Sequence, residues 1–162
     1  MTISATEFKQ AMQLWASGVT VITTYSEKYG LQGMTVSAFS SVSAESALIL
    51  CCVNDAADTI LGIDDSQSFA VNVLTTQQQE TSNQFAGGCS HEERFSKNTW
   101  CTAVTGAPLL NESLMSLDCK LVEKVRAGSH WIFIGEVQAS ELRHGEPLLY
   151  YRANYRELMI VD

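Results

Sequence analysis

A long alternating segment near the C-terminal end most constrains what this chain can fold into. In 113–126, apolar side chains such as Leu117 and Cys119 share one parity and charged side chains share the other. Alternation with a period of two predicts a strand with one buried and one solvent-facing side. The turn-forming stretch 127–129 follows, and 130–142 is expected to return as an antiparallel partner. This hairpin favours a fold built from neighbouring antiparallel strands.

The rest of the chain, taken as one domain over 1–162, repeats this rhythm of strand and turn. Segment 47–53 is apolar at both parities, which predicts a strand buried on both faces. About seven strands without a βαβ rhythm predict a mainly β fold with peripheral helices, an antiparallel closed or nearly closed barrel. Further strands are expected at Gly18–Ser26, Leu31–Phe39, Phe69–Leu74, Leu148–Arg152 and Glu157–Val161, and helices at Ser4–Ser17, Ala56–Asp65 and Thr76–Ala86.

Two local patterns refine this expectation. Ser4 and Glu7 form an S-x-x-E capping box before an apolar stripe, so the first helix is expected to cover the barrel. Segment 89–103 has no clear period and is expected to be a loop with one helical turn near 92–95.

Charge and cysteine content exclude several classes of protein. The net charge of −8 argues against a general nucleic-acid or anionic-membrane binder. The N-terminus has no basic region or apolar core, and no apolar run reaches the length of a membrane helix, so a cytoplasmic protein is expected. The five cysteines and three histidines have no metal-ligand spacing, so free thiols and no metal site are expected.

Segment 33–43 is rich in hydroxyl groups. Five Ser or Thr side chains lie between Thr35 and Ser43, with apolar residues between them and Gly33 before them. This pattern suits a flat ligand lying on a strand while hydroxyls and backbone N–H groups hold its anionic tail. An ordinary sheet edge with Ser and Thr on its wet face has the same composition.

Segment 33–43 resembles the signature of the short-chain flavin reductase family, whose members have an FMN-binding split β-barrel. Weaker matches follow in the family's order along nearly the whole chain. They are Phe8 with 18–24, 69–74, Phe85-Ala86, Arg94-Phe95, 106–110, 128–130 with 134–137, and 147–151 with Tyr155.

The resemblance implies a flavin site, usually at or near the interface of a homodimer. Backbone groups of four residues are expected to line the isoalloxazine edge: Thr35, Val36, Ser37 and Ala38. Ser41 is expected to lie toward the ribityl phosphate. The end of the next strand is expected to add three further flavin contacts, from Cys52, Val53 and Asn54.

Two residues are candidates for binding the flavin phosphate. Thr59 lies at the start of a helix, where free N–H groups attract phosphate, although plain helix stabilisation would also explain it. Arg94 matches a basic residue before Phe in the family and could pair with phosphate, although a solvated loop arginine is the alternative.

His130 is the candidate catalytic residue. In the family a Gly-Asp-His segment points its His toward the nicotinamide, whereas here Ser129 replaces the Asp between Gly128 and His130. A carboxylate that could orient the imidazole is therefore absent. A structural His at the end of a strand is the alternative.

The resemblance implies NAD(P)H-dependent reduction of FMN or FAD, which would supply reduced flavin to a separate monooxygenase component. No G-x-G-x-x-G follows a strand, so NADH or NADPH is expected on the open face above the flavin. A flavin-binding electron carrier or sensor without efficient NAD(P)H turnover is the alternative, and a related split-barrel oxidase or haem binder is more distant.

Overall fold

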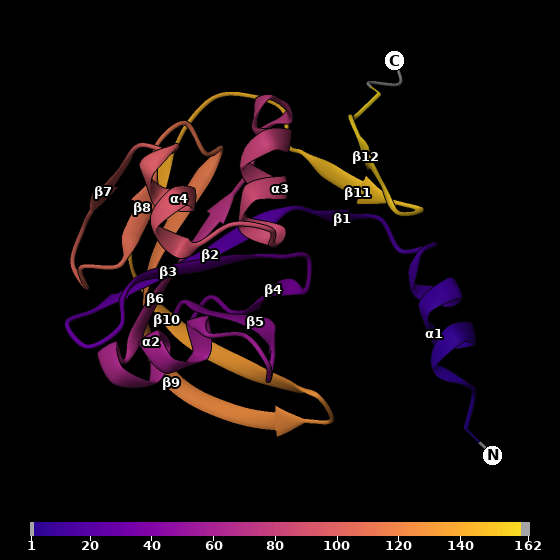
Figure 1. Cartoon of the computed structure of the whole chain (residues 1–162), viewed down its shortest axis with the longest axis horizontal. Helices are drawn as coiled ribbons and strands as arrows, with labels where there is room; N and C mark the ends of the chain where they lie inside the picture. Colours follow the sequence, from indigo (N-terminus) through magenta and orange to yellow (C-terminus); the bar gives the residue numbers. More distant parts are fainter. Residues whose placement is uncertain (1, 160–162) are drawn as a thin grey trace.

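The main sheet of the computed structural model, which describes residues 2–159, has seven antiparallel strands (Figure 1). Their spatial order is β3-β2-β6-β9-β10-β5-β4. The predicted long hairpin is its longest part, because β9 and β10 each run for 13 residues. In chain order the strands are β2 (Thr20–Ser26), β3 (Gly30–Val36), β4 (Phe39–Ser43), β5 (Leu48–Asn54), β6 (Ser68–Val73), β9 (Met115–Ala127) and β10 (His130–Leu142).

The two edges of this sheet, β3 and β4, are consecutive in the chain. Only Ser37 and Ala38 separate them, so the single strand expected at 31–39 is wrong beyond Val36. Within residues 2–159 no pairing joins β3 to β4, and the sheet curls into a barrel that is split there. The predicted antiparallel split barrel with peripheral helices is confirmed.

Strand β2 is buried on both faces, and this places the helices. Ile22 packs into a core inside the curled sheet with α2 (Thr59–Ser66), Phe69 and Phe133. On the opposite face Val21 packs with residues of α3 (Gln79–Ala86) and α4 (His91–Ser96). Helices α3 and α4 therefore cover the outside of the β2–β3 edge, whereas α2 closes the interior.

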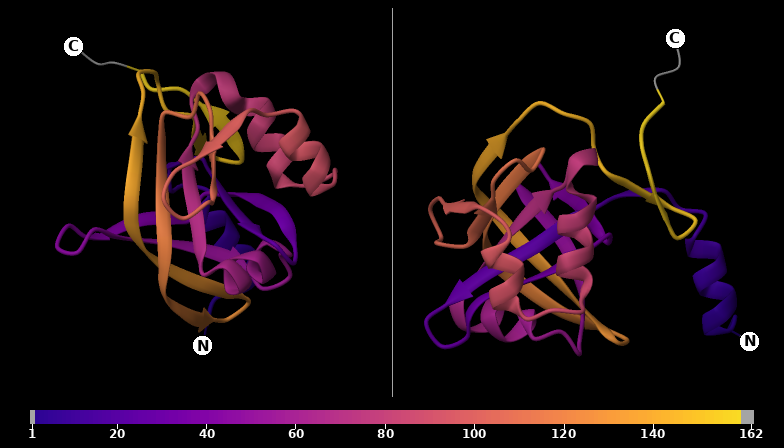
Figure 2. Two further views of the ribbon diagram at one scale, coloured as in Figure 1. Left: turned by 90° about the vertical axis from the view of Figure 1, so that its left-hand side faces the viewer. Right: turned by 45° about the horizontal axis from the view of Figure 1, so that its top comes forward.

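The N-terminal helix α1 (Ala5–Met12) lies away from the barrel (Figures 1 and 2). Its capping box forms as predicted, because the Glu7 N–H donates to Ser4 Oγ at 3.2 Å and the Ser4 N–H donates to the Glu7 carboxylate at 2.8 Å. None of its residues is buried, so the prediction that it covers the barrel is wrong for the single chain.

A small three-stranded sheet connects α1 to the barrel. Strand β11 (Leu149–Tyr151) pairs with both β1 (Ser17–Gly18) and β12 (Asn154–Arg156). The last described strand therefore ends before the strand predicted at 157–161. Residues 157–159 are not in a strand, so that prediction is wrong for them, and 160–161 lie outside the described residues. We call α1 and this sheet the arm.

Segment 89–103, expected to be mainly a loop, contains a helix and a short strand. Helix α4 is followed by a two-stranded sheet of β7 (Trp100–Thr102) and β8 (Pro108–Leu110), and the 3₁₀ helix η1 (Thr76–Gln78) precedes α3. The buried carboxylate of Asp118 accepts the N–H groups of Val104 and Thr105 at 2.7 and 2.8 Å. A charged acceptor on the main sheet thus holds the β7–β8 connection in place.

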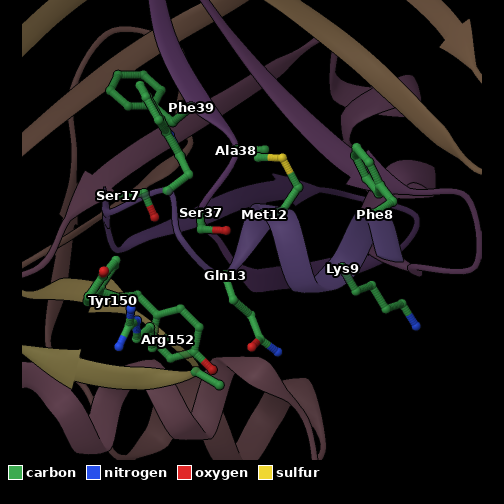
Figure 3. A pocket seen from close by; sticks show the side chains of 13 residues that line it. Phe8, Lys9, Met12, Gln13, Ser17, Ser37, Ala38, Phe39, Tyr150 and Arg152 are labelled. Carbon is green, nitrogen blue, oxygen red and sulfur yellow. The ribbon is translucent and has the colours of Figure 1, made fainter. Parts of the chain in front are cut away.

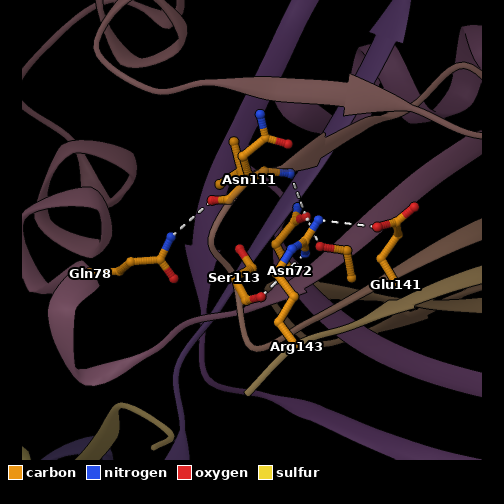
Figure 4. A network of polar contacts seen from close by, with 8 residues as sticks. Asn72, Gln78, Asn111, Ser113, Glu141 and Arg143 are labelled. Atoms are coloured by element: carbon orange, nitrogen blue, oxygen red, sulfur yellow. Dashed lines mark hydrogen bonds and ion pairs between the residues drawn. The ribbon is translucent and has the colours of Figure 1, made fainter. Parts of the chain in front are cut away.

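The buried amide of Asn72 ties β8 to the main sheet (Figure 4). Asn72 Oδ1 accepts the Leu110 N–H at 2.8 Å and the Ser116 hydroxyl at 2.9 Å, and its Nδ2 donates to the Val21 carbonyl at 3.1 Å. Nearby, Arg143 donates to the Ser113 carbonyl and pairs with Glu141 at 3.1 Å. Asn72 and Arg143 thus have hydrogen-bond partners, whereas the buried hydroxyl of Ser113 has none among the described residues.

The apolar strand β5 is buried on one face only. Ile49, Cys51 and Val53 lie in the core, whereas Leu48, Leu50 and Cys52 on the other face are half-buried. The prediction that β5 is buried on both faces is therefore wrong for its outer face in the single chain.

Gly135 on β10 is predicted to be intolerant of any side chain. A Cβ there would lie 2.6 Å from Cζ of the buried Phe69 and 3.0 Å from Cβ of Cys119. We expect Gly135→Ala to lower the free energy of unfolding by about 1–3 kcal/mol through overpacking. Urea denaturation measures this. Gly18→Ala is the control, since a Cβ at Gly18 meets nothing within 4 Å; equal effects of the two changes would contradict the packing argument.

Candidate active site

Three hollows lie in a row along the segment that joins the two sheet edges. The α2 pocket, of about 240 Å³, reaches Thr35. The middle pocket, of about 310 Å³, is lined by Thr35 and Ser37. The arm pocket, of about 490 Å³, is lined by Ser37 and Ala38. Thr35, Ser37 and Ala38 therefore border three adjoining hollows, which we call the groove and which run from a polar end at α2 to an apolar end at the arm.

The α2 pocket lies between the end of β3, the start of α2 and helices α3 and α4. It brings together three residues singled out in the sequence, Thr35, Thr59 and Arg94, which are 24 or more positions apart. It also contains Asp58 and His91.

Thr59 is the first residue of α2 and is 1% exposed. Its hydroxyl oxygen is buried and has no hydrogen-bond partner within residues 2–159. Asp58 at the N-cap makes no side-chain capping bond, so the first N–H groups of α2 are not capped by it. A buried unpaired hydroxyl beside a helix N-terminus is suited to an anionic group.

Arg94 is a half-buried, hydrogen-bonded residue and not a solvated loop arginine. Its Nη1 donates to the Gly33 carbonyl at 2.8 Å and its Nη2 donates to the Cys89 carbonyl at 3.0 Å. The Nε–H is buried and unpaired among the described residues. Arg94 thus fixes α4 on the free edge of β3 and keeps one donor and its positive charge available to the pocket.

His91 is a pocket residue that sequence reasoning missed. It begins α4, whose capping box is formed by Ser90 and Glu93. That S-x-x-E pattern is visible in the sequence and would have predicted the helix start and hence the position of His91. Burial, and then the positive charge of Arg94, lower the pKa of His91, while Asp58 opposes the shift.

The middle pocket has a polar wall built from α3 and the arm. Thr35 Oγ1 donates to the Ser82 carbonyl at 2.6 Å, which holds the end of β3 against α3. The Tyr155 hydroxyl lies 2.8 Å from Ser82 Oγ and 2.7 Å from Asn83 Oδ1. The arm and the barrel are therefore linked by hydrogen bonds at the groove.

The arm pocket is the largest and most apolar of the three (Figure 3). Phe8 and Met12 of α1 line one side, Ser37 and Ala38 line another, and Tyr150 closes it near β11. Two exposed aromatic residues line this pocket, Phe8 on α1 and Trp15 just after it, the latter at 70% exposure.

The remaining predicted residues lie outside these hollows. Ser41 is exposed on β4, and Val36 and Val53 point into the core, so only their backbone could reach a ligand. The other three are Cys52, half-buried on the outer face of β5, Asn54, whose Oδ1 accepts the Ala56 N–H at 2.9 Å, and His130, which pairs with Asn54 across β10 and β5.

His130 is exposed at the start of β10, and its Nδ1 lies 3.1 Å from Ser129 Oγ. Ser129 thus gives the imidazole a neutral partner at the place where the family pattern has a carboxylate.

The groove offers hydrogen-bond donors at one end and apolar side chains at the other, an arrangement that suits ligand binding. No cluster of His, Cys, Asp or Glu in 2–159 has the arrangement of a metal site. Burial raises the pKa of the Cys52 thiol, so this thiol stays protonated at neutral pH. Over the same residues, no helix is long and apolar enough to cross a membrane. A ligand with an anionic tail and a flat apolar body matches the two ends of the groove.

Comparison with known proteins agrees with this geometry. FMN reductase (NADH) RutF of Pseudomonas syringae pv. syringae (strain B728a) is 35% identical over 159 residues, which cover 96% of this chain and 88% of that protein. HsaB, the reductase subunit of a flavin-dependent monooxygenase of Rhodococcus jostii (strain RHA1), is 33% identical over 94% of this chain and 77% of its own length.

A solved structure shares the whole fold. Flavin reductase PheA2 in its native state superposes with a TM-score of 0.86 at 33% identity, covering 98% of this chain and 100% of that chain. The profile described as "Flavin reductase like domain" matches residues 12–159. The chain therefore belongs to the flavin reductase like family.

Proposed function

We propose that this protein is an NAD(P)H:flavin oxidoreductase that reduces FMN or FAD. The observation that carries the proposal is the groove along 35–38, which ends in the buried, unpaired donors of Thr59 and Arg94. Family membership supplies the reaction class, because the relatives are named FMN reductase (NADH) and monooxygenase reductase subunit.

The donor set of the α2 pocket fits a flavin phosphate. Thr59 would donate its hydroxyl and Arg94 its Nε–H, and both groups are already removed from water. Asp58 also borders the pocket and repels anions, so the phosphate is expected on the Thr59 and Arg94 side.

The chain's own role in this reaction is to bind, orient and exclude water. A bound flavin accepts a hydride from nicotinamide, and the protein supplies position and electrostatics. The backbone of Ser37 and Ala38 would border the ring edge, and the hydrogen bond from Thr35 to α3 would fix that edge relative to the phosphate site. Holding two rings at reacting distance is a large part of such a rate enhancement.

We propose that NADH or NADPH binds on the open side of the groove, near His130. The oxidoreductase SgcE6 of Streptomyces globisporus is described in complex with NAD and FAD fragments, and flavin reductase HpaC in complex with NADP⁺. Both are 28% identical to this chain. They support a nicotinamide nucleotide as the hydride donor without deciding which one.

A separate flavin-dependent oxygenase is the proposed consumer of the reduced flavin. HsaB is named as the reductase subunit of a flavin-dependent monooxygenase, and BorF as the flavin reductase component of a two-component tryptophan halogenase. We place the protein in the cytoplasm, where NADH and NADPH are available to it.

We also propose that the active form is a homodimer in which the arm docks on a second copy. Phe8 on α1 is 56% exposed, Trp15 just after α1 is 70% exposed, and the outer face of β5 is half-exposed. Monomeric proteins rarely expose apolar surfaces as large as these two to water. The arm pocket adjoins Ser37 and Ala38, so a second copy seated on it would complete the ring end of the groove.

Replacing Ser37 with a bulky residue tests the ring site. We expect Ser37→Leu to weaken FMN binding at least about tenfold, because the larger side chain would occupy the junction of the middle and arm pockets. Fluorescence titration of FMN measures this. Ser140→Leu, at an exposed serine on β10, is the control and should bind as wild type. A folded Ser37→Leu protein with unchanged affinity would show that the ring lies elsewhere.

Light scattering at micromolar concentration tests the dimer. We expect twice the mass of the chain for the wild type, and a monomer without bound flavin for Trp15→Glu, since a carboxylate cannot be buried there without a partner. Leu142→Glu, on an exposed part of β10, should stay dimeric. A flavin-loaded monomer would mean that one chain completes the site.

Anaerobic stopped-flow reduction tests His130. We expect His130→Ala to slow flavin reduction by NADH or NADPH roughly ten- to a hundredfold, the effect of losing one positioning contact of about 1–3 kcal/mol. Flavin binding and reoxidation by oxygen should not change. His144→Ala, at an exposed histidine, is the control. Equal rates for His130→Ala and wild type would make His130 structural, whereas slow reduction of the wild type itself would favour the electron-carrier alternative.

A further inference from the structure

His91 lies in the α2 pocket with Thr59 and Arg94 but has no role in the proposed function so far. Its ring is half-buried at the start of α4 and lines the pocket. It is held against the free edge of β3 and is not directed into open solvent.

The hydrogen bonds of the ring determine which nitrogen carries the proton. Gly33 N–H donates to His91 Nδ1 at 3.3 Å, and Arg94 Nη1 lies 3.4 Å from the same atom. Both neighbours are donors without a lone pair, so Nδ1 must be the acceptor. The proton of a neutral imidazole then resides on Nε2, the nitrogen opposite the contact with β3.

The charged groups around His91 keep this state neutral. Burial and the adjacent guanidinium of Arg94 both lower the pKa of His91, and the Asp58 carboxylate across the pocket only partly opposes them. At neutral pH the ring is therefore an uncharged hydrogen-bond donor with one defined tautomer. The neutral ring keeps its N–H proton, and so its ability to donate, as the pH rises above neutrality.

Together these features give the pocket a third donor. Thr59 Oγ1 and Arg94 Nε are buried and unpaired, and Nε2–H of His91 is the remaining donor of a side chain that lines the same hollow. We propose that His91 is a phosphate-binding residue that donates Nε2–H to the flavin phosphate. This inference rests on the proposed function, since it assumes that the tail of a flavin enters the α2 pocket.

The experiment compares FMN with riboflavin, which has the same ring and no phosphate. We expect His91→Leu to weaken FMN binding roughly 10- to 100-fold, the effect of losing one hydrogen bond to a charged group, and to leave riboflavin binding unchanged. His91→Gln keeps an N–H donor at nearly the same reach and should recover much of the loss. His144→Gln is the control at an exposed histidine.

The outcomes separate this inference from the proposed function. If the wild type binds neither FMN nor riboflavin, the proposed function is wrong. If the wild type binds both and His91→Leu weakens both equally, His91 only supports β3 and the inference is overturned. Unchanged FMN affinity in His91→Leu also overturns it.

The tautomer gives an independent measurement on the unmodified protein. Nitrogen-15 NMR of the imidazole at pH 7.5 should show a proton on Nε2 and none on Nδ1, with and without FMN. A proton on Nδ1 in the FMN complex would contradict the proposed donor, whatever the variants do.

Discussion

Three peptide units carry the chain from one edge of the main sheet to the other, and this constraint shapes the whole barrel. They can reach at most about 11 Å. Seven strands laid flat would put the two edges about 29 Å apart, at about 4.8 Å for each of six gaps. The sheet therefore has to curl until Val36 and Phe39 are neighbours. The groove along Ser37 and Ala38 is the place where this curled sheet fails to close.

An open edge of this kind needs protection, and the protein provides it with side chains. Gly33 on β3 directs its N–H and carbonyl outward, where His91 and Arg94 bind them. Covering an edge with a helix is a common way to prevent pairing with another chain. Here the same two side chains also border the α2 pocket, so one short helix serves both the fold and the site.

The predictable parts of the molecule were those with local patterns. The alternation of 113–126 describes one strand of the long hairpin and the Ser4–Glu7 capping box describes one helix start, and both formed as expected. The break after Val36 was hidden because hydroxyl residues continue evenly on both sides of it. Strands of three residues, such as β7 and β8, are too short for any period to emerge. The α2 pocket joins residues from four elements; the predicted helix start pointed to Thr59, and the family resemblance pointed to Arg94.

The unpaired hydroxyl of Thr59 has a thermodynamic consequence. Removing such a group from water without a partner costs about 1–3 kcal/mol, and this cost is incurred when the chain folds. A ligand that later meets the hydroxyl has no water to strip from it, so more of the contact energy becomes affinity. The empty protein is correspondingly less stable than its packing alone would make it. Preorganisation of this pocket is thus a transfer of free energy from the folding equilibrium to the binding equilibrium.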